Sequence, residues 1–248
     1  EKVASQNFKI IYRQACSRFC ISPYMENYYQ KKYNLTGSVL SPFRSRDASK
    51  YEQLPKKISG FESTFSFAYA GSITGMSSVL KLIKLANILA EYNWNLLIYS
   101  QLNQQEIKDQ GLDIPNIRAH PLISNQKLTQ ILHKEADALF LPMGFEAKSQ
   151  TVAETSFPSK LADYTATGLP ILIWGPSYCS PIRWAKDNPN VAEVVDTLEV
   201  SALAKSVKRL IERPQLRYLL GKTALIKGKE YFSYTQAIEK FFQRITID

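Results

Sequence analysis

The sequence predicts an α/β protein built on a doubly wound parallel sheet. From Phe65 onward, short apolar runs alternate with segments whose apolar residues recur at helical spacing, and this alternation continues for roughly 150 residues. Parallel strands that are buried on both faces have such apolar runs, and helices cover the two faces. The 248 residues are 45% hydrophobic and 21% charged, enough for one large domain and a fragment of another. No apolar run approaches the ~20 residues that a bilayer span needs.

Residues 1–57 form a separate N-terminal unit with a strong basic excess. They contain 11 Lys and Arg but only four Asp and Glu, so they hold +7 of the net charge of +9. The expected elements are an apolar-periodic segment around Phe8–Arg18 that leads into Phe19-Cys20-Ile21, a helix from Ser22-Pro23 to Asn34, and a short strand at 38–40. Residues 42–57 are polar and predict a linker. The unit is too small to close its own core, and a first residue other than Met indicates a piece of a longer chain.

Six strands and their helices follow in regular order. The strands are expected at 66–70, 95–99, 117–119, 138–141, 171–174 and 192–195. The helices are expected at 77–92, 103–110, 125–135, from Pro158 to Gly168, and at 200–212 and 215–228. A glycine turn at 71–75 and a long polar loop at 142–155 lie between them, and a Ser233-x-x-Gln236 capping box starts a last helix that runs to Ile245.

The central feature is the short helix that precedes the fifth strand. Pro158 fits its first turn, where a missing N–H is tolerated, and Gly168 fits a left-handed position just past its end. Lys160 and Asp163 are three residues apart, so both lie on one face. Free N–H groups at the helix start and the lysine charge favour a phosphate, while the carboxylate suits sugar hydroxyls. An exposed charge pair on a surface helix remains the alternative.

The glycine turn after the first strand is a second candidate. In Gly71-Ser72-Ile73-Thr74-Gly75 the backbone N–H groups follow a strand and precede a helix, where they are able to cradle a diphosphate. The spacing is neither that of a dinucleotide-binding turn nor that of a P-loop. A plain strand-to-helix turn uses the same residues.

Few other groups suggest chemistry. Glu146 and Glu154 lie in the long loop and are further candidates to approach a ligand, although exposed loop glutamates are usually only solvated. His120 and His133 do not pair with a nucleophile pattern. The three cysteines and two histidines show no metal-ligand spacing, so no metal site is expected.

The segment Phe-Pro-Ser-Lys-Leu-Ala-Asp-Tyr-Thr-Ala-Thr-Gly-Leu-Pro at 157–170 resembles the donor-binding signature of GT-B-fold glycosyltransferases of group 1 (family 4-like). Members of this family often have Pro-x-Lys-x-x-Glu-Tyr-x-Ala-x-Gly-x-Pro there. The resemblance extends from Phe65 to about Phe242. It implies the end of an acceptor domain and a linker at 1–57, a Rossmann-like donor-binding domain at 58–230, and a C-terminal helix at 231–248 that packs back on the N-terminal piece.

The resemblance also implies roles for individual residues. Lys160 corresponds to the lysine near the donor diphosphate, and Asp163 to the acidic residue that holds the ribose hydroxyls. The turn at 71–75 corresponds to the loop that faces the phosphates, and residues 122–124 to the segment that contacts the base. The implied donor-binding residues are Gly71, Ser72, Thr74, Gly75, Leu122, Ile123, Ser124, Pro158, Ser159, Lys160, Leu161 and Asp163. Catalytic residues remain unassigned, because they fall mostly in the missing part of the N-terminal domain.

Two departures from the family pattern stand out. The family usually has two glutamates eight residues apart, but Thr155 stands eight residues before Asp163. Many members also have a basic residue in or just after the first-strand loop, whereas here the first is Lys81, inside the helix. Lys160 and the helix start would then supply most of the positive charge for the phosphates.

The expected function is transfer of a sugar from a nucleotide diphosphate sugar to an acceptor hydroxyl, as in hexosyltransferases. The resemblance implies a nucleotide sugar and a glycan or lipid-linked acceptor as partners, and neither a metal cofactor nor nucleic acid. It implies a cytoplasmic protein, with peripheral contact at the inner face of the membrane as an open question. As mainly the donor-binding half, the chain is expected to be inactive alone.

Two alternatives remain open at this point. A nucleotide-sugar epimerase of the same fold would need acid and base side chains in the cleft, of which this chain supplies few. A non-catalytic module would instead bind nucleic acid or anionic membrane through residues 1–57, with a strong dependence on salt.

Overall fold

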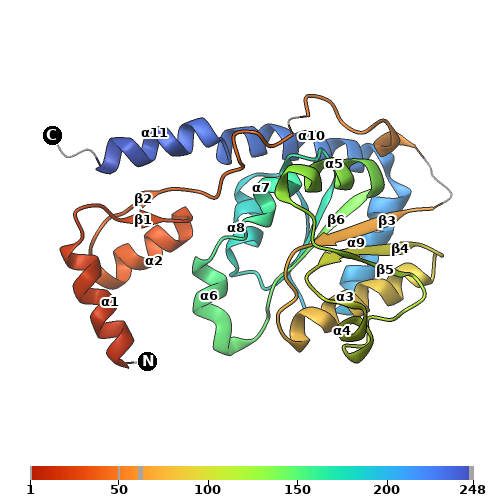
Figure 1. Ribbon diagram of the computed structural model, residues 1–248, viewed down its shortest axis with the longest axis horizontal. Helices are drawn as coiled ribbons and strands as arrows, with labels where there is room; N and C mark the ends of the chain where they lie inside the picture. Colours follow the sequence, from red (N-terminus) through yellow and green to blue (C-terminus); the bar gives the residue numbers. More distant parts are fainter. Residues whose placement is uncertain (1, 50, 61–63, 246–248) are drawn as a thin grey trace.

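The computed structural model describes residues 2–49, 51–60 and 64–245. A six-stranded sheet lies at its centre, with helices on both faces and an N-terminal piece to one side (Figure 1). Every strand pair is parallel, and the spatial order is β5-β4-β3-β6-β7-β8. The strands are β3 (Ser66–Ala70), β4 (Asn95–Ser100), β5 (Ile117–Pro121), β6 (Ala138–Pro142), β7 (Ile171–Trp174) and β8 (Glu193–Val195). This arrangement confirms the predicted fold class.

Helices cover the two faces because side chains alternate along each strand. Phe67 and Tyr69 of β3 pack on one face with α3, α4 and α9, while Ala68 and Ala70 pack on the other with α5, α7 and α8. α10 crosses from α9 to α7 and contacts both layers. These helices are α3 (Met76–Ala90), α4 (Gln104–Asp109), α5 (Asn125–Glu135), α7 (Lys160–Thr165), α8 (Ser180–Asp187), α9 (Val200–Glu212) and α10 (Pro214–Tyr231).

The strand order reverses between β3 and β6, and the sheet opens there. β3 pairs with β4 along all five residues but with β6 at only two, Phe67 and Ala68. The buried hydroxyl of Tyr164 on α7 fills the opening: it accepts a hydrogen bond from the Ala70 N–H at 2.8 Å and lies 3.5 Å from the Phe140 carbonyl oxygen. In such sheets the reversal creates a crevice at the carboxyl ends of the strands.

The structure corrects two predicted elements near this crevice. The expected loop at 142–155 contains a 3₁₀ turn, η2 (Ala147–Ser149), and a helix, α6 (Gln150–Thr155). The helix expected from Pro158 begins at Lys160, because the first bonds after Pro158 span three residues rather than four: Leu161 donates to the Pro158 carbonyl and Ala162 to that of Ser159. Residues 180–187, to which no helix was assigned, form α8.

The N-terminal piece is a small α/β unit that rests on the end of the chain. Its helices and strands are α1 (Lys2–Gln14), β1 (Phe19–Cys20), α2 (Pro23–Tyr33) and β2 (Ser38–Val39). Asn34 ends α2 in the left-handed conformation, with φ of 55°. The last helix, α11 (Tyr234–Ile245), runs alongside this piece (Figure 1), and Phe241 stacks on Phe19 with 5.4 Å between ring centroids.

The linker is fixed to the main domain by ring stacking and by hydrogen bonds to its backbone carbonyl groups. Tyr51 stacks on His133 at 3.8 Å, and the His133 Nδ1 lies 2.8 Å from the Thr167 carbonyl oxygen. Farther on, the linker forms a 3₁₀ turn, η1 (Lys56–Ser59). Arg217 is 2% exposed and donates to carbonyl groups of η1 and of the last turn of α9. Within the described residues, no helix has the length and apolar character of a membrane span.

Loss of the Tyr164 hydroxyl should destabilise the domain. We expect Tyr164→Phe to lower the free energy of unfolding by about 1–3 kcal/mol, because it leaves the buried Ala70 N–H without an acceptor. Urea denaturation measures this change. Tyr218→Phe is the matched control, since its ring is 45% exposed on α10, and it should alter stability by no more than about 0.5 kcal/mol. Equal stability of Tyr164→Phe and the wild type would contradict the assigned role.

Candidate functional site

A cavity of about 410 Å³ lies at the point where the strand order reverses. Its walls come from the loop after β3 and the start of α3 on one side, and from the loop after β6 on the other. Gly75, at φ of 77°, lines it, and the space above its Cα is open. The crevice expected for a doubly wound sheet is therefore present, with polar side chains in its walls.

Lys160 lies directly over the glycine turn. Gly71 has φ of 134°, and the Lys160 Nζ is 2.8 Å from the place where a Cβ at position 71 would lie. The ammonium is also 5.3 Å from the centroid of the Tyr69 ring. Two segments that are 89 residues apart in the sequence thus meet at the carboxyl ends of the strands. Only glycine provides both this backbone conformation and the space for the lysine.

The environment of Lys160 favours binding of an anion. The side chain is half-buried, and burial lowers the pKa of its ammonium from the ordinary lysine range. Tyr69 beside it does not carry a competing charge, because burial raises the pKa of Tyr69 to about 12. No carboxylate of the described residues lies within 4 Å of Lys160. An anionic ligand would supply the missing counter-charge.

Asp163 occupies the next turn of α7 and interacts with a linker residue. Burial raises the pKa of its carboxyl group, while the positive charge of Arg44 acts in the opposite direction. Arg44 is itself half-buried, and its Nε has no hydrogen-bond partner. The sequence did not single out Arg44, because nothing in a polar linker shows which of its residues approaches α7.

Glu146 belongs to a small network inside the cavity. Its carboxylate accepts a short hydrogen bond from the Ser77 hydroxyl and lies 3.7 Å from the Lys81 Nζ. The Ser77 bond, helped by the Lys81 charge, holds the pKa of Glu146 below its usual range. Burial lowers the pKa of Lys81, although Glu146 opposes this effect. Ser77 and Lys81 were not among the predicted site residues; their spacing of four on α3 is the signal that could have identified them.

The remaining predicted residues lie on several other elements and loops. Leu122, Ile123 and Ser124 follow β5, two strands away from β3. Leu161 is fully buried in the core, and Pro158 and Ser159 precede α7. The Ser72 carbonyl accepts a hydrogen bond from the Tyr69 hydroxyl, and the Thr74 carbonyl accepts one from the Ser78 hydroxyl. Glu154 lies on α6, where its carboxylate accepts a hydrogen bond from the Gln150 side chain at 2.7 Å.

The two histidines have packing roles in the structure. His120 stacks on Tyr99 with 4.9 Å between ring centroids. His133 stacks on Tyr51, and its Nδ1 is within hydrogen-bonding distance of the Thr167 carbonyl oxygen. Among the residues that the structure covers, no group of three or more His, Cys, Asp and Glu is arranged to hold a metal ion.

Comparison of the sequence with protein-family models finds no match, and comparison with curated proteins finds none either. Solved structures do match. Sucrose-phosphate synthase from Thermosynechococcus elongatus aligns with a TM-score of 0.70 and 13% identity over 98% of this chain and 61% of that chain. Anabaena HepE in complex with UDP-glucose aligns with a TM-score of 0.71 and 12% identity, over 98% and 66% respectively.

A mutant of S. aureus TarM, in complex with fondaparinux, α-GlcNAc-glycerol and UDP, aligns with a TM-score of 0.69 and 10% identity, over 99% of this chain and 47% of that chain. The chain thus spans about half to two thirds of the length of these structures. The matches show that the chain has the fold of the corresponding part of these GT-B structures, as the resemblance implied.

The Glu146 network predicts a pH-dependent contribution to stability. Because the pKa of Glu146 is lowered in the folded state, its stabilising effect is present above the ordinary glutamate pKa and is lost as the pH falls through the lowered value. We expect Glu146→Gln to cost about 1 kcal/mol at pH 7. The difference from the wild type should shrink as the pH falls below the ordinary glutamate pKa of about 4.3 and disappear once the pH has passed the lowered value. Urea denaturation at each pH measures it.

Glu154→Gln provides the matched control, because this glutamate is bonded only within α6. It should change stability by less than about 0.5 kcal/mol at pH 7. A Glu146→Gln variant that matches wild-type stability at pH 7 would show that the network does not form in solution.

Proposed function

We propose that this chain is the donor-binding half of a glycosyltransferase that moves a sugar from a nucleotide diphosphate sugar to an acceptor hydroxyl. The contact of Lys160 with the Gly71 turn, at the strand reversal of a GT-B fold, carries this proposal. It supports a site in which a half-buried cation and backbone N–H groups face the same ligand.

In this proposal the protein stabilises the leaving group. The bond between the sugar C1 and the diphosphate oxygen breaks, and the acceptor oxygen forms a new bond to C1. Negative charge then develops on the diphosphate, where Lys160 and the N–H groups of Ser72, Thr74 and Gly75 would neutralise it. The N–H groups of Gly71 and Ile73 already donate to the Tyr99 carbonyl and to the Gln101 Oε1. Positive charge would come from Lys160 and the other three N–H groups rather than from a metal ion. The base that takes the acceptor proton is outside this chain.

Two carboxylates would orient the donor. Asp163, one turn beyond Lys160, would accept hydrogen bonds from two ribose hydroxyls, as in the family signature. Glu146 is ionised and is fixed by Ser77 and Lys81 in the cavity wall. It would supply an acidic group for the sugar hydroxyls in place of the missing partner at Thr155.

The scope of the proposal follows from the length of the chain. Because it spans about half to two thirds of the matching structures, we infer that the acceptor, a glycan or lipid-linked hydroxyl, binds mainly outside it. The chain alone would bind nucleotide sugar and turn over little. As parts of the same proposal, the chain is located in the cytoplasm, and the sugar that it transfers is a hexose.

Nucleotide-sugar binding tests the site. Calorimetry with UDP-, GDP- and ADP-sugars should detect binding to the wild-type chain. We expect Lys160→Ala to weaken it at least about tenfold, because one charge-assisted contact to phosphate is lost. Asp163→Ala should weaken it about threefold to tenfold, because a hydrogen bond to a sugar hydroxyl contributes less.

Lys205→Ala is the control, since Lys205 is exposed on α9 outside the cavity. It should bind as the wild type does. Failure of the wild type to bind any of these sugars would refute the proposed function. Wild-type affinity in both Lys160→Ala and Asp163→Ala would place any binding elsewhere on the chain.

The affinity should also depend on pH in a predictable direction. Because burial lowers the pKa of Lys160, its charge is lost at a lower pH than in an ordinary lysine, whose pKa is about 10.4. Binding should weaken between neutral pH and about pH 10 in the wild type. Lys160→Arg stays charged throughout this range and should not show the same decline, which also controls for titration of the ligand. Parallel curves for both proteins would exclude Lys160 as the titrating group.

A further inference from the structure

A second polar cavity lies outside the donor crevice, where the linker passes the start of α11. It has a volume of about 290 Å³, and its walls come from the linker, from Ala166 and from the junction of α10 and α11. The linker residues in its wall are Arg44, Ser45, Arg46, Ala48, Tyr51 and Glu52. None of its lining residues belongs to the cavity at the strand reversal. The proposed donor site leaves this cavity without a function.

The cavity lining has an excess of positive charge. Its described residues include three cations, Arg44, Arg46 and Lys229, and one carboxylate, that of Glu52. The Glu52 carboxylate lies 2.6 Å from the Lys229 Nζ, so the charges of these two side chains offset each other. The two arginines have no carboxylate among the described residues within 4 Å. A nearby acidic group, Asp163, acts on Arg44 from longer range.

Arg44 also has an unsatisfied donor. Its Nε is buried from solvent and has no hydrogen-bond partner. A buried donor without a partner costs free energy, and a ligand that accepts a hydrogen bond removes this cost. Arginine presents several N–H groups in a planar fork that matches the oxygens of a phosphate.

The start of α11 completes the wall with further donors. Ser233, Tyr234 and Thr235 line the cavity, and α11 has 12 residues. The first N–H groups of a helix have no acceptor within the helix and carry partial positive charge. The Ser233 hydroxyl accepts from the Gln236 N–H at 3.4 Å, and the two residues between them, Tyr234 and Thr235, both line the cavity.

We propose that this cavity binds the phosphate group of a small ligand, held by Arg44, Arg46 and the start of α11. Two guanidinium groups, helix N–H groups and hydroxyls form the donor set that a phosphate dianion requires. The volume is at the lower end of the range for ligand sites, about 300–1,000 Å³, so the ligand is smaller than a nucleotide sugar. Its lining residues are separate from those of the donor cavity, although the charge of Arg44 acts on Asp163 of the proposed donor site.

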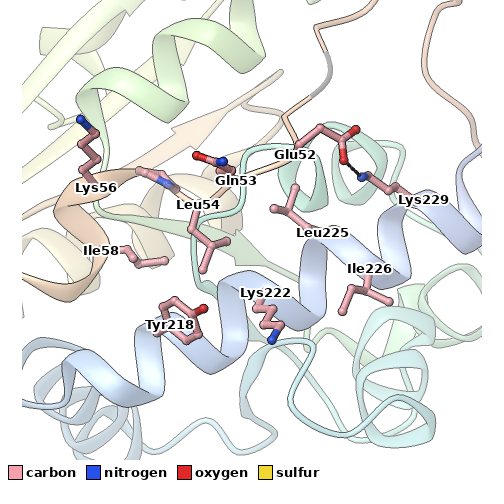
Figure 2. Close-up of a pocket in the computed structure, with 11 residues that line it drawn as sticks. Glu52, Gln53, Leu54, Lys56, Ile58, Tyr218, Lys222, Leu225, Ile226 and Lys229 are labelled. Atoms are coloured by element: carbon pink, nitrogen blue, oxygen red, sulfur yellow. Dashed lines mark hydrogen bonds and ion pairs between the residues drawn. The ribbon is translucent and has the colours of Figure 1, made fainter.

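A phosphate group can come from a soluble phosphate monoester or from a lipid headgroup. An adjacent groove of about 460 Å³ bears on this question. It is lined by Leu54, Ile58 and Ile226 as well as by lysines, and Figure 2 shows the Glu52 carboxylate meeting the Lys229 ammonium between the linker and α10. This pair lines both spaces. An acyl chain in the groove would therefore lie beside a phosphate in the cavity.

Titration with inorganic phosphate at constant ionic strength tests the site. Calorimetry on the full chain should detect binding, and Arg46→Gln should weaken it roughly tenfold or more, because one charge-assisted contact is lost. Arg44→Gln should act in the same direction. Arg118→Gln, an equal change of charge on the exposed strand β5, should leave the affinity within about twofold. Thermal unfolding confirms that each variant is folded, and Arg46, being exposed, can be replaced without disturbing the core.

Lys160→Ala separates this site from the donor crevice. If phosphate binds in the cavity, Lys160→Ala keeps its affinity while Arg46→Gln does not. Absence of binding, equal binding by Arg46→Gln and the wild type, or loss in Lys160→Ala alone would each overturn the proposal. Binding to phosphatidylcholine vesicles that contain phosphatidic acid is measured as well. Absence of binding to inorganic phosphate overturns the proposal unless the chain binds these vesicles. If Arg46→Gln abolishes that binding and pure phosphatidylcholine shows none, the phosphate is that of a lipid.

Discussion

The geometry of the donor site depends on the place where β3 and β6 separate. Two parallel strands that stop pairing leave buried N–H and C=O groups that need partners. The Tyr164 hydroxyl supplies one to Ala70 and thereby fixes α7 across the opening. Lys160 lies four residues earlier on the same helix and hence on the same face, so its ammonium lies over Gly71, the residue that follows Ala70. One buried hydrogen bond thus positions the cation.

Cations in partly buried positions are the second constraint on this molecule. Lys160 in the crevice and Arg44 in the linker are both half-buried, and burial lowers the pKa of each. Such charges are costly unless a counter-charge is present. Asp163 provides part of that charge for Arg44. The linker that joins the N-terminal piece to the main domain therefore has an electrostatic connection to the wall of the donor site.

Much of the fold could be predicted because its signals are local. The strands at 66–70 and 171–174 and the helices at 125–135 and 200–212 match in both bounds, since short apolar runs and helical periodicity need no knowledge of distant contacts. The helix α6 was missed for the opposite reason. Its sequence, Gln-Thr-Val-Ala-Glu-Thr, has only six residues and includes three β-branched ones, too little for a helix that is stable by itself. It is held from outside, and the Ser22 hydroxyl of α2 donates to the Thr155 carbonyl at its end.

For the site, the sequence by itself determined which residue types stand at the carboxyl ends of the strands. A glycine turn after β3, a lysine and an aspartate on one helical face, and a left-handed glycine at position 168 all follow from short-range rules. The tertiary structure decided which of them meet. Lys160 reaches Gly71, Glu146 reaches Ser77, and Arg44 approaches Asp163. The physical reason is that strand order, which sets these distances, arises from packing between segments far apart in the chain.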